Sequence, residues 1–541
     1  MQTQSAVAAH SPFCVRGLNL NPMPIPLLFL LSSLLLWLSS PGPGLSFCAW
    51  FALVPLLTGC AMVTPKKAAL LGFVSGLVYY LLLIYWVVIS LGTYGHLPWW
   101  LCGLALLLLS AYMSLYLAFF CAACSWSMQA VAPLWSAPLL WVALDFIRGL
   151  LFSGFPWQDL GYSQFNTPLL IQVADLAGHH GITFLIVMAN CLLFTLSARW
   201  RKKDAAWRPL PTRLQTTTGL LLIAAALAYS AVQLKVISRD LASAPGYPVA
   251  VIQGNIEQDQ KWVAEKQREA METYIELSSK AALQQQPALV IWPETAMPFF
   301  PPTSPLFPQV LARTVYSHHY LLLSGAPYFV EKEKDYDLYN SALLARPDGS
   351  QTLYFKQHLV PFGEYIPFSD ILPLPGPVVE SIGNFSAGNS ARPLAAGKAQ
   401  LGVLICFESI FPTLARQEVA NGANLLINIT NDAWFGRSCA SIQHMAMAVF
   451  RAVENRRSLA RAANTGISCF VDPAGRISQA TPLFTTCSIN GSPVLFAQHT
   501  VFTRFGYLFP IACLIFLIPV AFWIRIIRIS FLKQQQNPKI N

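Results

Sequence analysis

Charged side chains are scarce in this chain. Of its 541 residues, 35 are Lys or Arg and 25 are Asp or Glu, so that charged residues make up 11% of the total. Typical soluble domains contain about 25%. The deficit is concentrated in the first 240 residues, and hydrophobic residues make up 55% of the whole chain. Because the length also exceeds one ordinary domain, the composition predicts a membrane part followed by a water-soluble part.

Acidic residues are the scarcer of the two charged classes, which leaves a formal net charge of +10. The basic residues lie beside hydrophobic stretches, as the positive-inside rule expects, and they do not cluster within the soluble part. The positive charge therefore indicates membrane topology, and nucleic acid is not an expected partner.

Groups that would hold a metal or a redox centre are also lacking. Cys121 and Cys124 have the spacing of a CxxC motif, but they lie in or at the end of a hydrophobic stretch, where packing is the simpler explanation. His179 and His180 have no second group of ligands at a suitable spacing. We expect no metal and no cofactor. The sequence leaves open whether three cysteines of the soluble part form a disulfide, namely Cys439, Cys469 and Cys487.

Eight hydrophobic stretches predict a polytopic α-helical membrane bundle, because about 20 apolar residues are needed to cross a bilayer as a helix. The first two stretches are marginal in length. The eight lie near residues 25–40, 46–63, 68–91, 98–124, 130–151, 181–198, 217–236 and 506–528.

The basic residues give these spans an orientation. Lys66 and Lys67 follow the second stretch, six Lys and Arg residues lie between the sixth and the seventh, and Arg525 and Arg528 end the eighth. Cytoplasmic loops are rich in Lys and Arg, so these segments should be cytoplasmic and the soluble part should lie outside. The predicted order is a disordered cytoplasmic lead (1–22), a seven-span domain (23–240), an extracytoplasmic catalytic domain (247–493), a transmembrane helix (504–530) and a cytoplasmic tail (531–541).

Within the soluble part, three short apolar strands each end on a reactive side chain. Residues 287–294 (PALVIWPE) end on Glu294, residues 352–356 (TLYFK) end on Lys356, and residues 401–406 (LGVLIC) end on Cys406. Ligands bind at the carboxyl ends of strands in open α/β sheets. A helix that starts near Cys406 would stabilise its thiolate. A carboxylate base, a cation and a thiol are the groups that covalent acyl transfer requires.

In this order, Glu294, Lys356 and Cys406 resemble the catalytic groups of the nitrilase superfamily of carbon–nitrogen hydrolases. The resemblance continues through residues 424–436 and 443–466 and covers roughly 248–493. It implies that the soluble part is an inserted α/β domain with the nitrilase-like α-β-β-α sandwich fold.

The whole chain, with this domain between a seventh and an eighth span, resembles the apolipoprotein N-acyltransferases. Residues 251–256 (VIQGNI), 260–262 (QKW) and 154–164 (GFPWQDLGYSQ) support the resemblance. It implies an enzyme of the bacterial inner membrane, with the catalytic domain in the periplasm. We expect a monomer, because nothing in the sequence suggests a larger assembly. The acyl chain would pass from the sn-1 position of a membrane phospholipid, through a thioester on Cys406, to the α-amino group of a diacylated apolipoprotein.

The resemblance also implies supporting roles for Glu364 and Glu408, and substrate contacts for Trp262 and Trp157. Family members often have tyrosine after the nucleophile, whereas this chain has Phe407, whose backbone N–H could still assist the oxyanion.

Two other functions remain open. A membrane-tethered amidase of the nitrilase type would use the same three residues but would not need seven preceding spans. A transporter or scaffold would need charged or interrupted helices at mid-membrane, and the spans show few.

Several further features have a simple and a functional interpretation. Residues 297–302 and 368–379 are Pro-rich and apolar, and each is either a lid that keeps a thioester dry or an ordinary packed loop. Tyr162, like Trp157, could anchor at the membrane interface. Asp145 and Arg148 are either functional or a helix-end ion pair. The remaining group is most simply a ladder of charges on one helix, formed by Arg451, Glu454 and Arg457.

Overall fold

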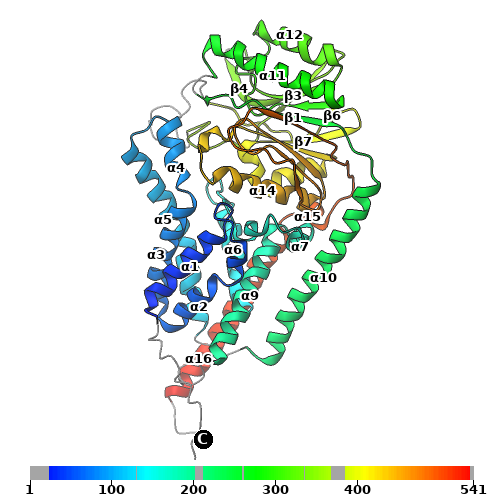
Figure 1. Ribbon diagram of the computed structural model, residues 1–541. Coiled ribbons are helices and arrows are strands. Elements are labelled where there is room, and N and C mark those ends of the chain that lie inside the picture. The colour runs from blue at the N-terminus through cyan, green and yellow to red at the C-terminus, as the bar shows by residue number, and fades with distance from the viewer. Residues whose placement is uncertain are drawn as a thin grey trace, which may run out of the picture.

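The computed structural model describes residues 23–128, 131–200, 211–258, 261–333, 335–366 and 384–536. The predicted lead, 1–22, and the candidate lid 368–379 lie outside the described residues. Figure 1 shows a helical part below and a domain of two sheets with helices above it.

The lower part is helical. Pro24, Thr64 and Pro98 immediately precede three of its helices, and Thr212 forms a capping box with Gln215 at the start of a fourth. The helices are α1 (Ile25–Ser39), α2 (Leu53–Met62), α3 (Pro65–Leu83), α4 (Trp86–Ile89), α5 (Trp99–Ser127), α6 (Ser136–Arg148), α7 (Pro168–Ile171), α8 (Ala174–Ala177), α9 (His179–Trp200), α10 (Arg213–Ser243), α15 (Val501–Phe505) and α16 (Leu508–Gln536).

Five helices in the described residues are long and apolar enough to cross a membrane: α3, α5, α9, α10 and α16. The predicted count of eight spans is therefore not confirmed. The stretch 46–63 divides into a short 3-10 turn and α2, and the stretch 130–151 contains only the 13 residues of α6. A 13-residue helix is about 20 Å long, against about 30 Å of hydrocarbon. Hydropathy counts apolar residues, whereas turns decide how many of them form one helix.

The upper domain contains two mixed sheets of six strands. The first has the order β12-β1-β2-β3-β4-β5 and the second the order β11-β10-β9-β8-β7-β6. In the first sheet, β1 and β2 and then β2 and β3 are parallel, and in the second β7, β8 and β9 are parallel. The strands are β1 (Val249–Gln253), β2 (Leu289–Ile291), β3 (Leu321–Glu331), β4 (Tyr336–Ala345), β5 (Gln351–Phe355), β6 (Leu394–Ala396), β7 (Ala399–Ile405), β8 (Leu425–Thr430), β9 (Ser458–Ala463), β10 (Cys469–Val471), β11 (Ile477–Ser478) and β12 (Cys487–Gly491).

The two sheets pack face to face, and helices cover their outer faces. Val251 and Ile291 of the first sheet share a buried cluster with Val403 and Ile427 of the second. The outer face of the first sheet packs against α11 (Ala264–Gln285) and α12 (Leu306–Leu311), and the second against α13 (Pro412–Ala420) and α14 (Ala440–Asn455). This is the predicted α-β-β-α sandwich.

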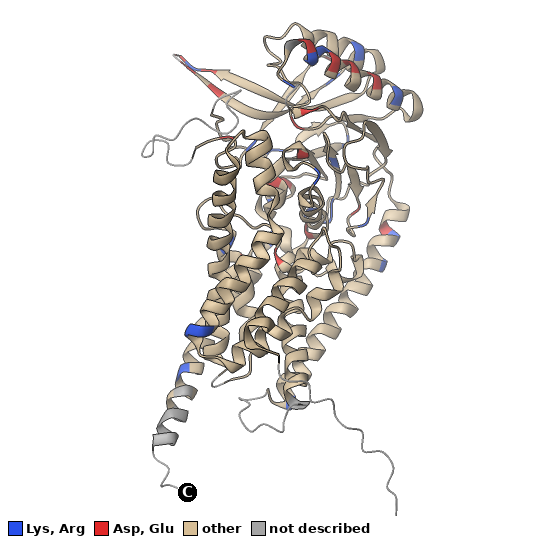
Figure 2. Cartoon of the chain, turned by 60° about the vertical axis from the view of Figure 1, so that its left-hand side comes forward, with Lys and Arg blue, Asp and Glu red and all other residues tan. Residues whose placement is uncertain are grey.

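The helical part and the sandwich share one hydrophobic core. Residues of α13 and α14, such as Ala415 and Val449, belong to the same buried cluster as Leu83 of α3 and Ile186 of α9. Figure 1 shows α14 between the sheets and the membrane helices. In Figure 2 the long helices below are almost free of charged residues, whereas a helix at the top carries both signs. The sandwich therefore rests directly on the apolar bundle.

Candidate active site

Three strand ends meet at one edge of the sandwich. Glu294 follows β2, Lys356 follows β5 directly, and Cys406 follows β7 directly. The backbone of Cys406 has a φ of +51°, a left-handed conformation that is uncommon for any residue other than glycine. Residues held in this way cluster at active sites, where surrounding contacts maintain the strain.

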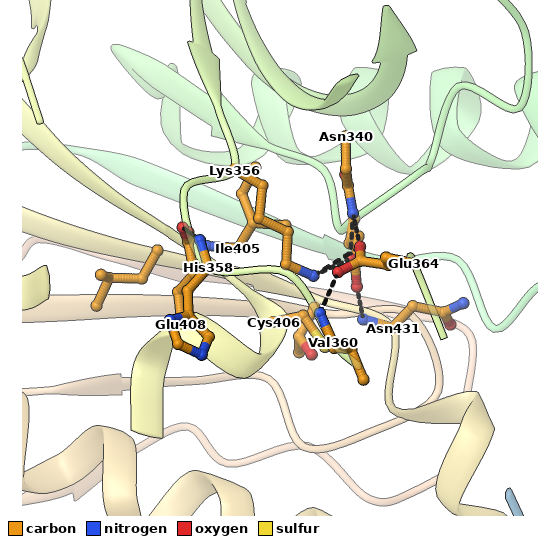
Figure 3. Close-up of polar contacts among 12 residues, drawn as sticks. Asn340, Lys356, His358, Val360, Glu364, Ile405, Cys406, Glu408 and Asn431 are labelled. Atoms are coloured by element: carbon orange, nitrogen blue, oxygen red, sulfur yellow. Dashed lines mark hydrogen bonds and ion pairs between the residues drawn. The ribbon is translucent and has the colours of Figure 1, made fainter. Parts of the chain in front are cut away.

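A compact set of polar contacts joins Lys356 to two carboxylates, those of Glu294 and Glu364. Figure 3 shows Lys356 and Glu364 within this set. The Nζ atom of Lys356 lies 2.8 Å from Oε1 of Glu364 and 3.5 Å from Oε1 of Glu294. The side-chain amide of Asn340, on β4, donates to both carboxylates, at 2.8 Å and 2.9 Å. The backbone N–H of Asn431 donates to the second oxygen of Glu294 at 2.9 Å. Both carboxylates are therefore fixed in position by donors.

Glu408 connects the strand that carries the thiol to the strand that carries the lysine. Its carboxylate is fully buried and accepts backbone N–H groups of Ile405, Gln357 and His358, at 2.7 Å, 2.6 Å and 3.2 Å. Ile405 precedes the cysteine and Gln357 follows the lysine, so one side chain fixes the spacing of Lys356 and Cys406. Burial raises the pKa of Glu408 to about 7, although these donors and Lys356 oppose the shift.

The electrostatics of the site favour a protonated thiol at rest. Burial raises the pKa of Cys406 well above its usual range, Glu294 raises it further, and Lys356 lowers it only in part. The sequence predicted a thiolate stabilised by the following helix, but the structure shows a short 3-10 turn after Cys406, with α13 starting only at Pro412. Burial alone would lower the pKa of Lys356, but Glu364 and Glu294 raise it above its ordinary value, so the lysine stays cationic. A base is therefore needed to remove the thiol proton.

The three groups line a cavity of about 570 Å³ that the membrane helices also line. Its walls include Val87 of α4 and Leu109 of α5 on one side, and Glu294, Lys356 and Cys406 on the other. The cavity is therefore wide enough for an apolar chain beside the polar strand ends.

Every other predicted site residue contacts or lines this cavity, except Glu408, which lies behind it. Glu364, Phe407, Trp262 and Trp157 are part of its wall. The ring of Phe407 stacks against Phe155 of the helical part, with centroids 6.4 Å apart. Phe407 therefore packs against the helical part through its ring alone, and this packing does not need the hydroxyl group of a tyrosine.

The aromatic residues of the segment after α6 do not anchor in a lipid interface, contrary to one sequence interpretation. Trp157 is 1% exposed and Tyr162 is fully buried. The indole N–H of Trp157 donates to Oε1 of Gln443 on α14 at 2.8 Å, and the hydroxyl of Tyr162 accepts from Arg451 at 3.0 Å. Both side chains join the helical part to the sandwich.

The charged residues of α14 are also buried and do not form a simple surface ladder. Arg451 and Glu454 make the expected i,i+3 ion pair at 3.0 Å, but neither is exposed. Arg457 lies beyond the helix and donates to backbone carbonyls, among them that of Ala423. The carboxylate of Glu454 also accepts the backbone N–H of His179 on α9. The Nε2 atom of His179 in turn lies 2.7 Å from Asp159. These side chains are buried because α14 packs against the helical part, and the local sequence pattern does not indicate that packing.

Asp159, His179 and His180 come close enough to hold a metal ion. However, Asp159 is already paired with Arg148 and His179, and Arg148 also pairs with Asp145 at 3.3 Å. We therefore assign Asp159 and His179 to buried ion pairs within the helical part, and Asp145 and Arg148 form the helix-end pair that was one of the two interpretations.

The segment 297–302 is a packed loop, which was the second interpretation. Met297 is fully buried and Phe299 nearly so, both in the core under α11 and α12, and Gln267 of α11 donates to the carbonyl of Pro298 at 2.7 Å. It does not cover the cavity.

Sequence reasoning missed three residues of the site: Asn340, Asn431 and Lys261. Asn340 lies in the middle of β4, and Asn431 follows β8 directly. The strand-end pattern could have identified Asn431. No local signal identifies Asn340, because its position depends on the register of β4 with β5.

Two family models match separate parts of the chain. Residues 32–192 match the apolipoprotein N-acyltransferase N-terminal domain, and residues 248–490 match carbon-nitrogen hydrolases. Among solved structures, an amidase of the nitrilase superfamily from Nesterenkonia has a TM-score of 0.35 and 19% identity, over 47% of this chain and 92% of its own.

Two curated relatives are similar along most of their length. An apolipoprotein N-acyltransferase from Geobacter metallireducens is 41% identical over 489 residues, which are 90% of this chain and 92% of that protein. One from Haemophilus ducreyi is 32% identical over 471 residues, 85% of this chain and 88% of that protein. Because this similarity includes both the helical part and the sandwich, the chain belongs to the apolipoprotein N-acyltransferase family of enzymes.

Proposed function

We propose that this enzyme transfers a fatty acyl chain from the sn-1 position of a membrane phospholipid to the α-amino group of an S-diacylglyceryl-cysteine at the N-terminus of an apolipoprotein. The observation that carries the proposal is the shared cavity, in which membrane helices and the three strand-end residues face one space. A hydrolase of small soluble amides has no need of such a wall. Both lipid substrates lie in one leaflet, so their reacting groups must reach a site that opens toward the bilayer.

The first half-reaction forms a thioester. Glu294 takes the proton of Cys406, the sulfur attacks the sn-1 ester carbon, and the ammonium of Lys356 stabilises the oxyanion. The ester C–O bond then breaks, and Glu294 returns the proton to the departing lysophospholipid. The observed donors to Glu294, from Asn340 and Asn431, support a fixed carboxylate in this role.

The second half-reaction forms an amide. The neutral α-amine attacks the thioester carbon, Glu294 accepts its proton, and the thiolate leaves and is reprotonated. The order implies ping-pong kinetics. The proposed location is the bacterial inner membrane with the sandwich in the periplasm, where such acceptors would be found.

The acyl-enzyme is the test of this proposal. Enzyme mixed with phospholipid alone should gain one fatty acyl group on Cys406, measured by intact-protein mass spectrometry and released by neutral hydroxylamine. A diacylated lipopeptide should then discharge it as an amide. Cys406→Ala should abolish the adduct, and Glu294→Gln or Lys356→Ala should slow its formation, the latter by roughly 10²–10³-fold.

Two outcomes would contradict the proposal. Acyl transfer that proceeds without an adduct would rule out the covalent route. Rapid discharge by water without any amide would favour the hydrolase.

A further inference from the structure

The charged residues in the described wall of the cavity are two acids and two lysines: Glu294, Glu364, Lys356 and Lys261. Lys356 is paired with both acids, and both acids also accept from Asn340. Together these three groups carry a net formal charge of −1. Lys261 brings the sum of the four charges to zero, but among the described residues its ammonium makes no ion pair or hydrogen bond with either acid.

Lys261 lies in the short segment between β1 and α11, immediately before Trp262 of the cavity wall. It is only 2% exposed, and its Nζ atom has no hydrogen-bond partner among the described residues. Burying an unpaired ammonium costs several kcal/mol, and most buried charges are paired for this reason. A cation that is kept unpaired in the wall of a cavity therefore indicates an anionic ligand.

The charge state of Lys261 is compatible with this role. Burial lowers its pKa to about 8, against the opposing effect of Glu294, so most of the lysine is still protonated at pH 7. An anion bound beside it would raise the pKa again.

We propose that Lys261 binds the phosphodiester group of the phospholipid donor, and so selects phosphate-bearing lipids over neutral glycerides during thioester formation. The inference rests on the proposed function and deepens it. The acceptor is not the ligand of Lys261, because the α-amine of the acceptor is positively charged when protonated and the lysine would repel it. In a glycerophospholipid the phosphate is joined to the same three-carbon glycerol as the sn-1 ester, so both groups can lie in one cavity.

The test compares a donor that has a phosphodiester headgroup with one that has no headgroup. The rate of acyl-Cys406 formation is measured with phosphatidylglycerol and with a diacylglycerol of the same acyl chains, and the ratio of the two kcat/KM values is reported. Lys261→Met keeps the length of the side chain and removes the charge, and it should lower the ratio by roughly 10- to 100-fold, as expected for a charge-assisted hydrogen bond. Lys261→Arg should restore much of the ratio.

Lys266→Gln is the matched control, since Lys266 is partly exposed on α11 and pairs with Glu269. Its ratio should equal that of the wild type. A thermal unfolding midpoint for Lys261→Met at or above that of the wild type shows that folding is intact, because an unpaired buried charge has been removed.

Two results would overturn the inference alone: an unchanged ratio in Lys261→Met, or a loss confined to discharge by a diacylated lipopeptide, which would assign the lysine to the amine. If the wild type formed no adduct with either donor, the proposed function would fail and the inference with it.

Discussion

Glu408 and Glu418 are both fully buried near the same strand, but their surroundings differ. Glu408 accepts three backbone N–H groups, whereas neither carboxyl oxygen of Glu418 has a partner among the described residues. Burial, with a smaller contribution from the nearby Glu408, raises the pKa of Glu418 to about 8. Glu408 therefore positions the site, while Glu418 is a buried acid that stays protonated at neutral pH.

Glu418 should make stability fall as the pH rises. Its pKa in the folded protein is above the ordinary value of 4.5, so the unfolded chain releases the proton first. The unfolding free energy therefore decreases between about pH 4.5 and pH 8, by about 1.4 kcal/mol for each pKa unit. Glu418→Gln should be more stable than the wild type at pH 8 and nearly equal at pH 5, measured by thermal unfolding in detergent. Identical pH profiles for the two proteins would refute this explanation.

At the scale of elements, α14 holds the sandwich on the bundle. Gln443, one turn into the helix, accepts the indole N–H groups of Trp157 and Trp86 at 2.8 Å and 3.2 Å. Its own amide donates to the carbonyl of Leu83 at the end of α3. One buried side chain thus satisfies three groups of the helical part, all close to the cavity.

Removal of this side chain should destabilise the protein. Gln443→Ala leaves two buried indole donors unpaired, at roughly 1–3 kcal/mol each, so we expect a loss of about 2–6 kcal/mol of unfolding free energy. A reversible titration with SDS in mixed micelles measures it. Gln284→Ala, at an exposed position on α11, should change stability by less than about 0.5 kcal/mol. A small effect for both variants would mean that water replaces the lost amide.

At the scale of the whole molecule, one end of α10 and one end of α16 lie on the side of the helical part that is opposite the sandwich. In Figure 1 the start of α10 and the end of α16 both lie at the bottom, far from the sandwich. Arg213 and Arg525 lie near those ends. This arrangement supports the predicted topology, in which the basic ends are cytoplasmic and the sandwich is periplasmic.

Labelling of intact spheroplasts with a membrane-impermeant thiol reagent tests that topology. The background protein has the three partly exposed cysteines of the sandwich, Cys406, Cys439 and Cys487, replaced by Ser. A cysteine introduced at the exposed Ser350 should react, and one introduced at Asp204 should react only after the cells are lysed. The reverse pattern would place the sandwich in the cytoplasm.

The parts that could be predicted from sequence are those with a local signal. Strand ends carry Glu294, Lys356 and Cys406, because a short apolar run stops where the chain leaves a sheet. Asn340 lies inside a strand, and its meeting with two carboxylates depends on strand register, which sequence pattern alone does not specify. Lys261 could not be recognised, since an unpaired lysine looks like any surface lysine until its burial is known.

The helical part was harder to predict for a different reason. Hydropathy could identify the apolar stretches, including that of α6, but it could not show which of them are too short to cross a bilayer. The burial of Arg451 and Glu454 depends on packing between segments almost 300 residues apart, as their contacts with Tyr162 and His179 show.

The common core of α13, α14 and the bundle has a practical consequence. A fragment made of residues 247–493 alone would present Ala415, Val449 and their neighbours to water, together with an Arg451–Glu454 ion pair that has lost its contacts with Tyr162 and His179. Such an exposed apolar surface promotes aggregation of the fragment. The sandwich therefore cannot be produced as a soluble enzyme by truncation of the chain. Crystallisation, screening or immobilisation needs the full-length protein in a lipid or detergent environment.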